Sequence, residues 1–251
     1  MKTFYFTATG NSLEVAKAVG GELHSIPQVL KSDQTSFEDD AIGLVFPCYA
    51  FGTPAPVREF LQKVKLKSGY LFAVITYGDF EAGALAHFRG LAKSCGLSPD
   101  YLNSISMVDN YLNFCKMEDQ QQLLPGKKVA ENLSGIVADI GQRKAFIKKP
   151  WFLFTLMSYL LNFFYRLQPG SVDKKFSIEE SCDGCGICAS LCPVDNIVIQ
   201  QGKPEFLHKC ITCYACTHGC PKNAIRCRSE RSRARFRNSA VSLQEIIAAN
   251  K

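Results

Sequence analysis

Four cysteines and a proline organise one short stretch, which reads Cys182-Asp183-Gly184-Cys185-Gly186-Ile187-Cys188-Ala189-Ser190-Leu191-Cys192-Pro193. The same spacing, C-x2-C-x2-C-x3-C-P, returns 28 positions later as Cys210, Cys213, Cys216, Cys220 and Pro221. Ile197 and Ile225 also keep this register. The cysteine-rich region therefore contains two copies of one small, loop-rich structural element.

This spacing suits cubane iron–sulfur clusters. Three thiolates placed two residues apart can wrap one cluster on a tight loop. The fourth cysteine starts a helical turn before a proline and points away toward the other cluster. We therefore expect two [4Fe-4S] clusters with crossed ligands. One set is Cys182, Cys185, Cys188 and Cys220, and the other is Cys210, Cys213, Cys216 and Cys192.

Zinc and disulfides are the alternatives. Zinc sites usually pair two C-x2-C knuckles across a longer loop, which this pattern does not do. The first residues, Met1–Phe6, lack the apolar core and cleavage site of a signal peptide. We therefore expect a cytoplasmic protein whose thiols stay reduced. The cysteines outside the repeat are expected to be buried apolar filler; they are Cys48, Cys95, Cys115 and Cys227.

The N-terminal part alternates short apolar runs with helical patterns. Strands are predicted at 3–7, 22–26, 41–46, 70–76 and 101–108, and helices at 12–19, 56–64, 82–95 and 127–146. Strands that alternate with helices predict βα crossover units. The expected fold is α/β, with a doubly wound parallel five-stranded sheet that helices cover on both faces.

A polar loop follows the first predicted strand and reads Thr7-Ala8-Thr9-Gly10-Asn11-Ser12. Backbone N–H groups and the positive end of the helix dipole make such a loop an anion site. Alone, the loop could simply cap the helix. Here it ends the first strand of a doubly wound sheet, and ligands of such sheets bind at the C-terminal ends of strands.

The loop resembles the flavodoxin phosphate motif, T-x-T-G-x-T/S, with serine in last place. Two later strand ends agree with this resemblance: the loop at 47–54 and the stretch Thr76-Tyr77-Gly78-Asp79. The resemblance implies an FMN whose ring is flanked by aromatics among Tyr49, Phe51 and Tyr77. The cofactor-binding residues that it implies are Thr7, Thr9, Gly10, Asn11, Ser12, Pro47, Tyr49, Phe51, Gly52, Tyr77, Gly78 and Asp79.

Most of the chain resembles flavodoxin–ferredoxin fusion proteins, by its domain order, its cysteine pattern and its segment 235–238. The resemblance implies a flavodoxin-like domain over 1–146 and an apolar connecting helix and linker over 147–175. A small α+β ferredoxin-like domain with two clusters would follow over 176–251. The implied function is a relay of single electrons between FMN and the clusters, and onward to redox partner proteins.

The formal charge of +6 does not require a nucleic-acid partner. Each oxidised cluster with four thiolates carries about −2, and a flavin phosphate adds about −2, so the loaded protein would be near neutral. Six arginines lie between residues 226 and 237. We expect them to form a solvated face that makes weak ion pairs. They could also guide an acidic redox partner.

Residues 151–165 are nearly all apolar. As a helix they would be ~22 Å long, short of the ~30 Å hydrocarbon core of a bilayer. Thr155, Ser158, Asn162 and Arg166 fall on one narrow stripe of that helix. We expect a helix buried between the domains, with a helix lying in a membrane interface as the alternative.

Two other functions stay open at this stage. No G-x-G-x-x-G opens a helix after a strand, so direct oxidation of a nicotinamide is disfavoured. An FMN-dependent reductase of a small acceptor, such as a quinone or nitro compound, is the alternative to a pure electron carrier. A regulator whose clusters sense oxygen or iron is the third class.

Overall fold

The computed structural model describes residues 1–149, 152–167 and 170–251. These residues form two compact units. The first unit takes the described residues of 1–7, 11–108 and 124–167. The second unit takes 8–10, 109–123 and the described residues after 167. Each unit is described by itself below.

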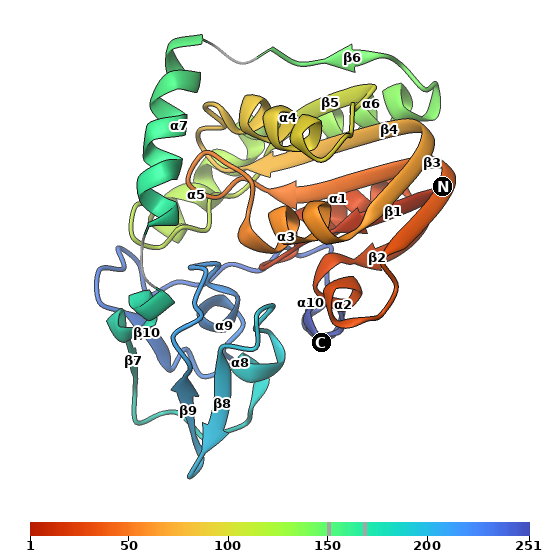
Figure 1. Cartoon of the computed structure of the whole chain (residues 1–251). Helices are drawn as coiled ribbons and strands as arrows, with labels where there is room; N and C mark the ends of the chain where they lie inside the picture. The colour runs from red at the N-terminus through yellow and green to blue at the C-terminus, as the bar shows by residue number, and fades with distance from the viewer. Residues whose placement is uncertain (150–151, 168–169) are drawn as a thin grey trace. The chain divides into compact units, whose positions relative to one another are not determined.

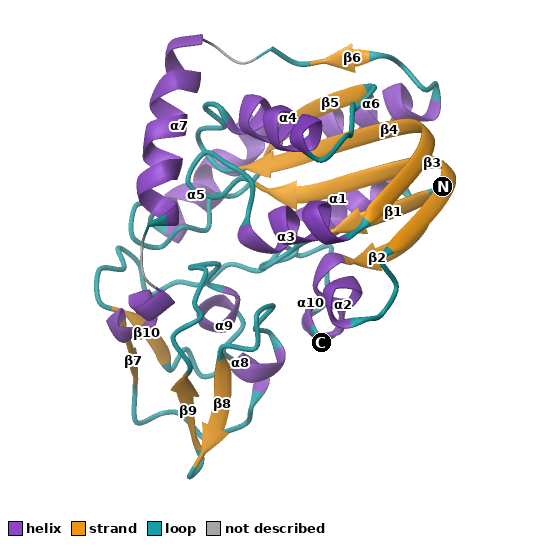
Figure 2. Cartoon of the chain, viewed as in Figure 1, coloured by secondary structure: helices purple, strands orange, loops and turns teal. Residues whose placement is uncertain are grey.

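The first unit contains a parallel sheet of six strands in the order β2-β1-β3-β4-β5-β6 (Figure 2). The strands are β1 Lys2–Tyr5, β2 Glu22–Ser25, β3 Ser36–Pro47, β4 Lys65–Tyr77, β5 Tyr101–Ser106 and β6 Phe146–Ile147. All five predicted strands are present, and the first five have the 2-1-3-4-5 order of one common doubly wound sheet. The expected count of five is wrong, because the two-residue β6 pairs with Tyr101 and Leu102 at the sheet edge.

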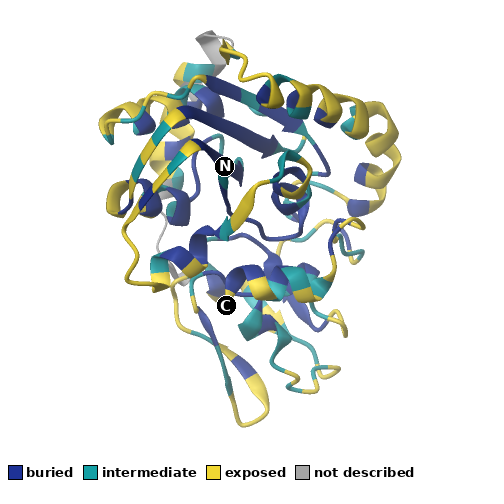
Figure 3. Ribbon diagram, turned by 90° about the vertical axis from the view of Figure 1, so that its right-hand side faces the viewer, coloured by how far each residue is buried: buried dark blue, intermediate teal, exposed yellow. Residues whose placement is uncertain are grey.

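The central strands β3 and β4 begin earlier than the sequence predicts. Their C-terminal halves are continuous buried runs, as expected for strands covered on both faces. Their N-terminal halves pair with one another from Ser36 and Lys65 onward and alternate between exposed and less exposed positions. These polar halves lack the apolar signal that marks the rest of each strand. Figure 3 shows the buried strands in dark blue.

Helices cover both faces of this sheet, with α3 and α4 in front and α1 and α6 behind (Figure 1). Their bounds are α1 Asn11–Val19, α2 Ile26–Lys31, α3 Ala55–Lys63, α4 Ala84–Ser94 and α6 Val129–Gly141. The short α2 was not predicted; the Ser25 hydroxyl caps it by accepting from the Gln28 N–H at 3.4 Å. The helix predicted at 127–146 is too long, because it ends at Gly141 and Phe146 pairs in β6.

A further helix of the first unit, α7 Phe152–Arg166, packs against α4. Ser158 and Asn162 on its polar stripe are 2% and 1% exposed, whereas its leucines and phenylalanines that the structure describes are exposed. Within the described residues of the first unit, taken by itself, no other element therefore covers these apolar side chains. Trp151 and the side chain of Arg166 lie outside the described residues. Among the described helices, none has the length and apolarity needed to cross a membrane.

The second unit is a small α+β structure built on two antiparallel pairs of strands. β7 Phe176–Ile178 pairs with β10 Ile225–Cys227, and β8 Ile197–Gln200 pairs with β9 Lys203–Phe206. Each cysteine run leads into one helical turn, α8 Ile187–Ser190 or α9 Ala215–His218. The unit also contains α5 Met117–Leu123, the 3-10 helix Gly170–Lys175 and α10 Leu243–Asn250. A second 3-10 helix, Leu124–Lys127, lies in the first unit.

Candidate functional site

Two pockets of the second unit are each lined by four of the eight repeat cysteines. The first pocket, of about 330 Å³ including solvent at its mouth, is lined by Cys182, Cys185, Cys188 and Cys220. The second, of about 340 Å³, is lined by Cys210, Cys213, Cys216 and Cys192. In each pocket three cysteines come from one run and the fourth from the other. The structure therefore brings together the same two sets of four that the spacing predicts.

Left-handed backbone at matching positions shapes both cysteine loops. In the first run these positions are Gly184 and Gly186, with φ of 72° and 76°. In the second run Thr212 and Tyr214 hold the same region, with φ of 53° and 58°. Gly184 has a further reason to be glycine, because a Cβ there would collide with the backbone of Gly202. The two copies thus fold alike although their loop residues differ.

Backbone N–H groups donate to several of the sulfurs. Cys192 and Cys220, the fourth cysteines of the two runs, each accept from the residue four positions later, Asn196 at 3.2 Å and Ala224 at 3.3 Å. Cys210 accepts from the Thr212 N–H at 3.3 Å. Hydrogen bonds of this kind stabilise thiolates and tune the potential of a bound cluster.

Burial raises the pKa of several of these thiols. The pKa of Cys188 and of Cys210 is raised to about 11, and those of Cys213 and Cys216 are also raised. A buried thiolate needs a positive partner, which cluster iron supplies when it is bound. All twelve cysteines are free thiols rather than disulfides. The donor set therefore fits two four-iron clusters.

Aromatic side chains form one wall of the second pocket. Phe176 stacks on Phe206 with ring centroids 5.7 Å apart, and the Tyr214 ring meets Phe176 edge-on at 5.9 Å. The Tyr214 hydroxyl donates to Asn113 Oδ1 at 2.6 Å. Such an apolar wall limits solvent access, which is one control on cluster potential.

Residues 109–123 pack behind this wall, against Tyr214, and sequence reasoning missed these contacts. Leu112 and Met117 are fully buried in a cluster with Tyr214 and Cys227. His218 fastens the same segment, because its Nε2 lies 2.8 Å from the Asn110 carbonyl oxygen and its Nδ1 accepts from the Phe236 N–H at 3.1 Å. Burial lowers the pKa of His218 to about 4, so the imidazole is neutral. No local pattern in 109–123 points to these contacts.

The cysteines outside the repeat do not share one environment. Cys227 is buried, as expected for apolar filler. Cys48, Cys95 and Cys115 are only half-buried, so that expectation is wrong for them.

The arginine segment is only partly solvated. Arg228, Arg231, Arg233 and Arg237 are exposed, as expected. Arg226 and Arg235 instead share Glu230: Arg235 lies 3.1 Å from one carboxylate oxygen, and Arg226 pairs with the other. Only 11% of the Arg226 side chain and 7% of the Arg235 side chain are exposed, so two of the six arginines are internal to the second unit.

In the first unit, residues of the predicted flavin loops meet at the C-terminal edge of the sheet. The Ser12 hydroxyl lies 2.8 Å from the Thr76 hydroxyl, and the Cys48 N–H donates to the Thr76 carbonyl at 2.7 Å. Asn11 Nδ2 donates to the Val108 carbonyl at 3.1 Å. The ends of β3, β4 and β5 and the start of α1 are thereby joined, as parallel strands require.

The loop after β3 is a tight turn with strained backbone. Tyr49 and Gly52 exchange two backbone hydrogen bonds of 3.0 and 2.9 Å, and Ala50 and Phe51 have φ of 45° and 62°. Pro47 ends β3 directly before this turn. Non-glycine residues with positive φ cost free energy and concentrate at functional loops.

Two side chains of α7 hold the loops of the predicted flavin site. Asn162 Nδ2 donates to the Ala50 carbonyl at 3.2 Å, and the Ser158 hydroxyl accepts from the Gly83 N–H at 2.8 Å. A Cβ on Gly52 would collide with Asn162. The polar stripe of this helix was visible in the sequence, but its binding to the loops was not.

A largely covered lysine, Lys127, organises the loop after β4. Lys127 Nζ donates to the carbonyls of Met107 at 2.6 Å and Gly78 at 3.2 Å, and it pairs with Asp79 at 2.9 Å. Lys148 Nζ lies 5.8 Å from the centroid of the Tyr77 ring, and burial raises the pKa of Tyr77. Sequence reasoning also missed Lys127 and Lys148, because no spacing marks them.

Thr7 is 2% exposed in the first unit, whereas Thr9 and Gly10 group with the second. Thr9 Oγ1 accepts from Asn110 Nδ2 at 2.6 Å, and the Thr9 carbonyl accepts from the Asn238 N–H at 2.9 Å. Gly10 has φ of 102°, and a Cβ there would lie 2.9 Å from Asn238 Cβ. The hydroxyl, amide and backbone donors of 7–12 at the start of α1 are the kind that bind a phosphate.

Residues 172–225 match the family model of the 4Fe-4S dicluster domain. This match contains all eight cysteines of the two pockets, and it supports iron–sulfur electron transfer as the role of this part of the chain. No curated protein matches the chain in sequence. A solved structure, that of the Trp repressor binding protein from Bacillus subtilis, is similar at a TM-score of 0.34 and 13% identity. The likeness covers 54% of this chain and 94% of that one, and it is too weak to bear on function.

Proposed function

We propose that this protein relays single electrons between an FMN and two [4Fe-4S] clusters, and onward to redox partner proteins. The observation that carries the proposal is the pair of pockets, each lined by three cysteines of one run and one of the other. The dicluster match over 172–225 supports the cluster part of the proposal. Iron–sulfur clusters exchange one electron at a time, and FMN supplies one- or two-electron chemistry when bound.

The eight cysteines are proposed as the cluster ligands in the crossed sets given above. The N–H donors at Asn196, Thr212 and Ala224 stabilise charge on the sulfurs that they contact. The apolar wall of Phe176, Phe206 and Tyr214 keeps water from the second pocket. These residues fix the ligands in place and set the environment in which electrons enter and leave.

For FMN, the proposal rests on the flavodoxin-type order of the first five strands and on the meeting of strand-end loops at one edge. Thr7, Thr9, Gly10, Asn11 and Ser12 would hold the phosphate. The loops at 47–52 and 77–79 would border the ring, with Tyr49, Phe51 and Tyr77 as the aromatics. The side chains of Lys127 and Asn162 position these loops by donating to loop carbonyls, those of Gly78 and Ala50.

A relay within one chain also has a kinetic reason. Joining two carriers by a short link holds one near the other at an effective concentration of about millimolar. The chain continues from β5 of the first unit directly into 109–123, which form part of the core around Tyr214. No free diffusion of two carriers is then needed before transfer.

The test begins with the full chain reconstituted anaerobically. We expect about eight irons and one FMN per chain by iron, sulfide and flavin assays. A rapid low-potential pulse should then reduce the clusters, and flavin absorbance should follow with a rate independent of protein concentration. Cys210→Ser should slow this rate, whereas Cys95→Ser, outside the repeat, should not.

Three results would contradict the proposal. Zinc in place of iron would remove the clusters, and absence of flavin would leave a plain dicluster carrier. A transfer rate that rises in proportion to concentration would mean that units of different molecules exchange electrons. Steady turnover of a quinone or nitro compound would instead favour the alternative, an FMN-dependent reductase fed by its own clusters.

A further inference from the structure

Helix α7 of the first unit is amphipathic, but it turns its polar side toward the protein and its apolar side outward, unlike an ordinary surface helix. Its polar stripe faces the protein, where Ser158 and Asn162 bind the Gly83 and Ala50 backbones. Its apolar side chains face outward: Leu156 is 67% exposed, Leu160 58% and Phe164 58%. Leu161, Phe163 and Leu167 are also exposed. At about 100° per residue, these six side chains form one continuous face.

The inward side of α7 is fixed, so this face cannot turn toward the protein. The Tyr159 hydroxyl donates to the Ala86 carbonyl of α4 at 3.2 Å, and its ring lies 5.7 Å from the His87 ring. A side chain on Gly83 would collide with Ser158. Rotation of the helix would bury its leucines only by breaking these hydrogen bonds. Exposed apolar surface of this extent on a soluble unit marks an interaction site.

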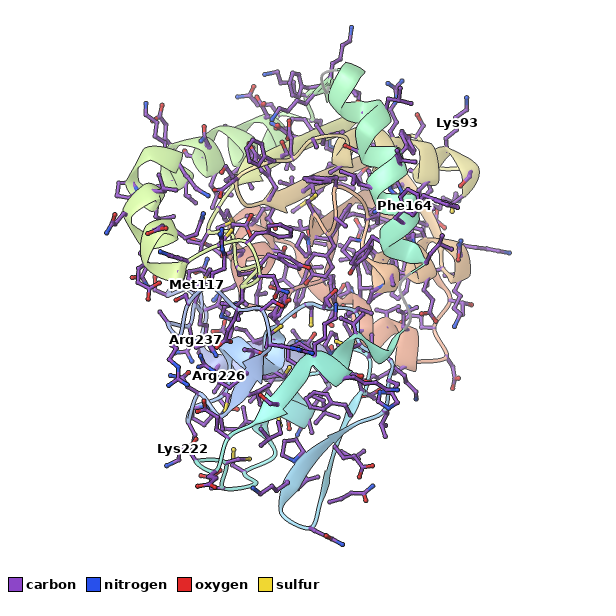
Figure 4. All side chains as sticks on the ribbon, turned by 90° about the vertical axis from the view of Figure 1, so that its left-hand side faces the viewer. Lys93, Met117, Phe164, Lys222, Arg226 and Arg237 are labelled. Atoms are coloured by element: carbon purple, nitrogen blue, oxygen red, sulfur yellow. The ribbon has the colours of Figure 1, made fainter. Side chains whose placement is uncertain are left out.

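Exposed cations lie near the helix. Residues 140–172 contain no aspartate or glutamate, but three of their cations are already paired, Arg143 with Asp40, Lys144 with Asp139 and Lys148 with Glu81. Lys149 is exposed shortly before the helix. Arg89 and Lys93 are exposed on α4, whose Gly90 lies beside the Tyr159 hydroxyl. Figure 4, in which α7 faces the viewer, labels Phe164 on α7 and Lys93 on α4.

We propose that the outer face of α7 docks this protein onto an anionic lipid surface, with the helix lying in the interface. An apolar Leu and Phe face bordered by cations is the combination that binds headgroups and the outer acyl region together. A helix of 15 residues is ~22 Å long, too short to span but long enough to lie along the surface. This proposal does not depend on the presence of FMN.

A second copy of the chain fits this face less well. One helix ~22 Å long and ~10 Å wide offers roughly 200 Å² of contact, well below the roughly 800 Å² per partner of a stable interface. An acidic protein partner would satisfy the cations but would leave much of a leucine and phenylalanine face without a matching surface. A lipid interface supplies both components.

The experiment is flotation of the reconstituted full chain with phosphatidylcholine vesicles, alone or mixed with phosphatidylserine. We expect binding to the mixed vesicles, weakened by salt. The triple variant Leu156→Gln, Leu160→Gln, Phe164→Gln should lose about tenfold in partitioning for each position. Lys149→Gln should lose ~5-fold, on phosphatidylserine vesicles only.

A matched triple variant controls for general loss of surface apolarity: Leu23→Gln, Leu123→Gln, Leu207→Gln, three exposed leucines outside α7. It should bind vesicles like the wild type. Iron content and circular dichroism of all variants should equal those of the wild type, which separates docking from folding and from cofactor loading.

Three outcomes would overturn the proposal. The wild type could ignore both vesicle types, or the α7 triple variant could bind as well as the wild type. Sedimentation could also reveal a dimer that the α7 variant dissociates, which would assign the face to a second copy. A protein partner as occupant would appear as vesicle indifference of the purified chain.

Discussion

The two cysteine pockets share one ligand spacing but differ in their surroundings. The first pocket is open: Cys185 is exposed, and exposed Asp183 and Lys222 belong to its lining. The second pocket has Phe176, Phe206 and Tyr214 in its lining and no exposed cysteine, and burial raises the pKa of three of its four thiols. Spacing therefore fixes which ligands meet, whereas segments far away in sequence decide how dry each site is. The difference between the pockets can be tested one pocket at a time.

The largest effect is expected when the fourth cysteine of either run is replaced by alanine. Cys220→Ala should remove the cluster of the first pocket, although Cys220 belongs to the second run, and about four irons should remain. Cys192→Ala should do the same to the second pocket. Iron assays with electron paramagnetic resonance would report which cluster survives. Selective loss of the Cys210, Cys213 and Cys216 cluster in Cys220→Ala would refute crossed ligation.

A smaller effect is expected from the segment 109–123, which packs behind Tyr214 of the second pocket. Leu112 is fully buried beside Tyr214, so Leu112→Ala should cost about 2–5 kcal/mol of unfolding free energy. The matched control is Leu123→Ala in the same segment, 53% exposed, which should change stability by less than about 0.5 kcal/mol. Denaturant midpoints of the loaded protein would measure both.

Leu112→Ala could lower the unfolding free energy equally whichever cluster is present. In that case the packing of Leu112 would not be specific to the second pocket. The Cys192→Ala and Cys220→Ala backgrounds, each retaining one cluster, would distinguish these outcomes.

The rate of iron removal should also differ between the two pockets. In the Cys192→Ala background only the first cluster remains, and in Cys220→Ala only the second. An anaerobic chelator should bleach the first cluster several-fold faster, because Cys185 is exposed whereas Cys213 is buried. Visible absorbance against time gives both rates. Equal rates would show that local opening of the unit, rather than static burial, limits iron loss.

The sequence predicted well what is encoded locally. The cysteine sets follow from spacing, and the strands follow from apolar runs such as those in β3 and β4. It missed α2, whose six residues are too few for a helical period, and β6, whose two residues pair only because Tyr101 lies beside them. It found the polar stripe of α7, but neither composition nor period reports whether the stripe or the apolar face turns toward the protein.

The candidate site divides in the same way. Ser12 and Thr76 were placed together correctly, because the ends of parallel strands share one sheet edge. Lys127 and Leu112 were missed, since their roles depend on carbonyls and rings contributed by other parts of the chain. The left-handed Thr212 and Tyr214 were also invisible, because neither residue type favours positive φ.

The smallest expected effect concerns the polar edge of the second pocket. Tyr214→Phe keeps the ring that packs on Phe176 and removes only the hydroxyl that donates to Asn113 at 2.6 Å. A net cost of about 1 kcal/mol is expected for one such hydrogen bond. Asn113 Oδ1 also accepts from the Cys227 thiol at 3.3 Å, so the amide oxygen retains one donor in the variant.

The measurement is a double-mutant cycle of Tyr214→Phe with Asn113→Ala, read from denaturant midpoints of the loaded chain. Coupling near 1 kcal/mol would mean that the hydroxyl acts through Asn113 and fastens 109–123 to the pocket. If Tyr214→Phe were silent while Leu112→Ala was costly, apolar packing alone would close the second pocket. Loss of the second cluster in Tyr214→Phe would instead place the hydroxyl in the control of the cluster itself, and the contrast between a dry and an open pocket would then rest on one hydrogen bond.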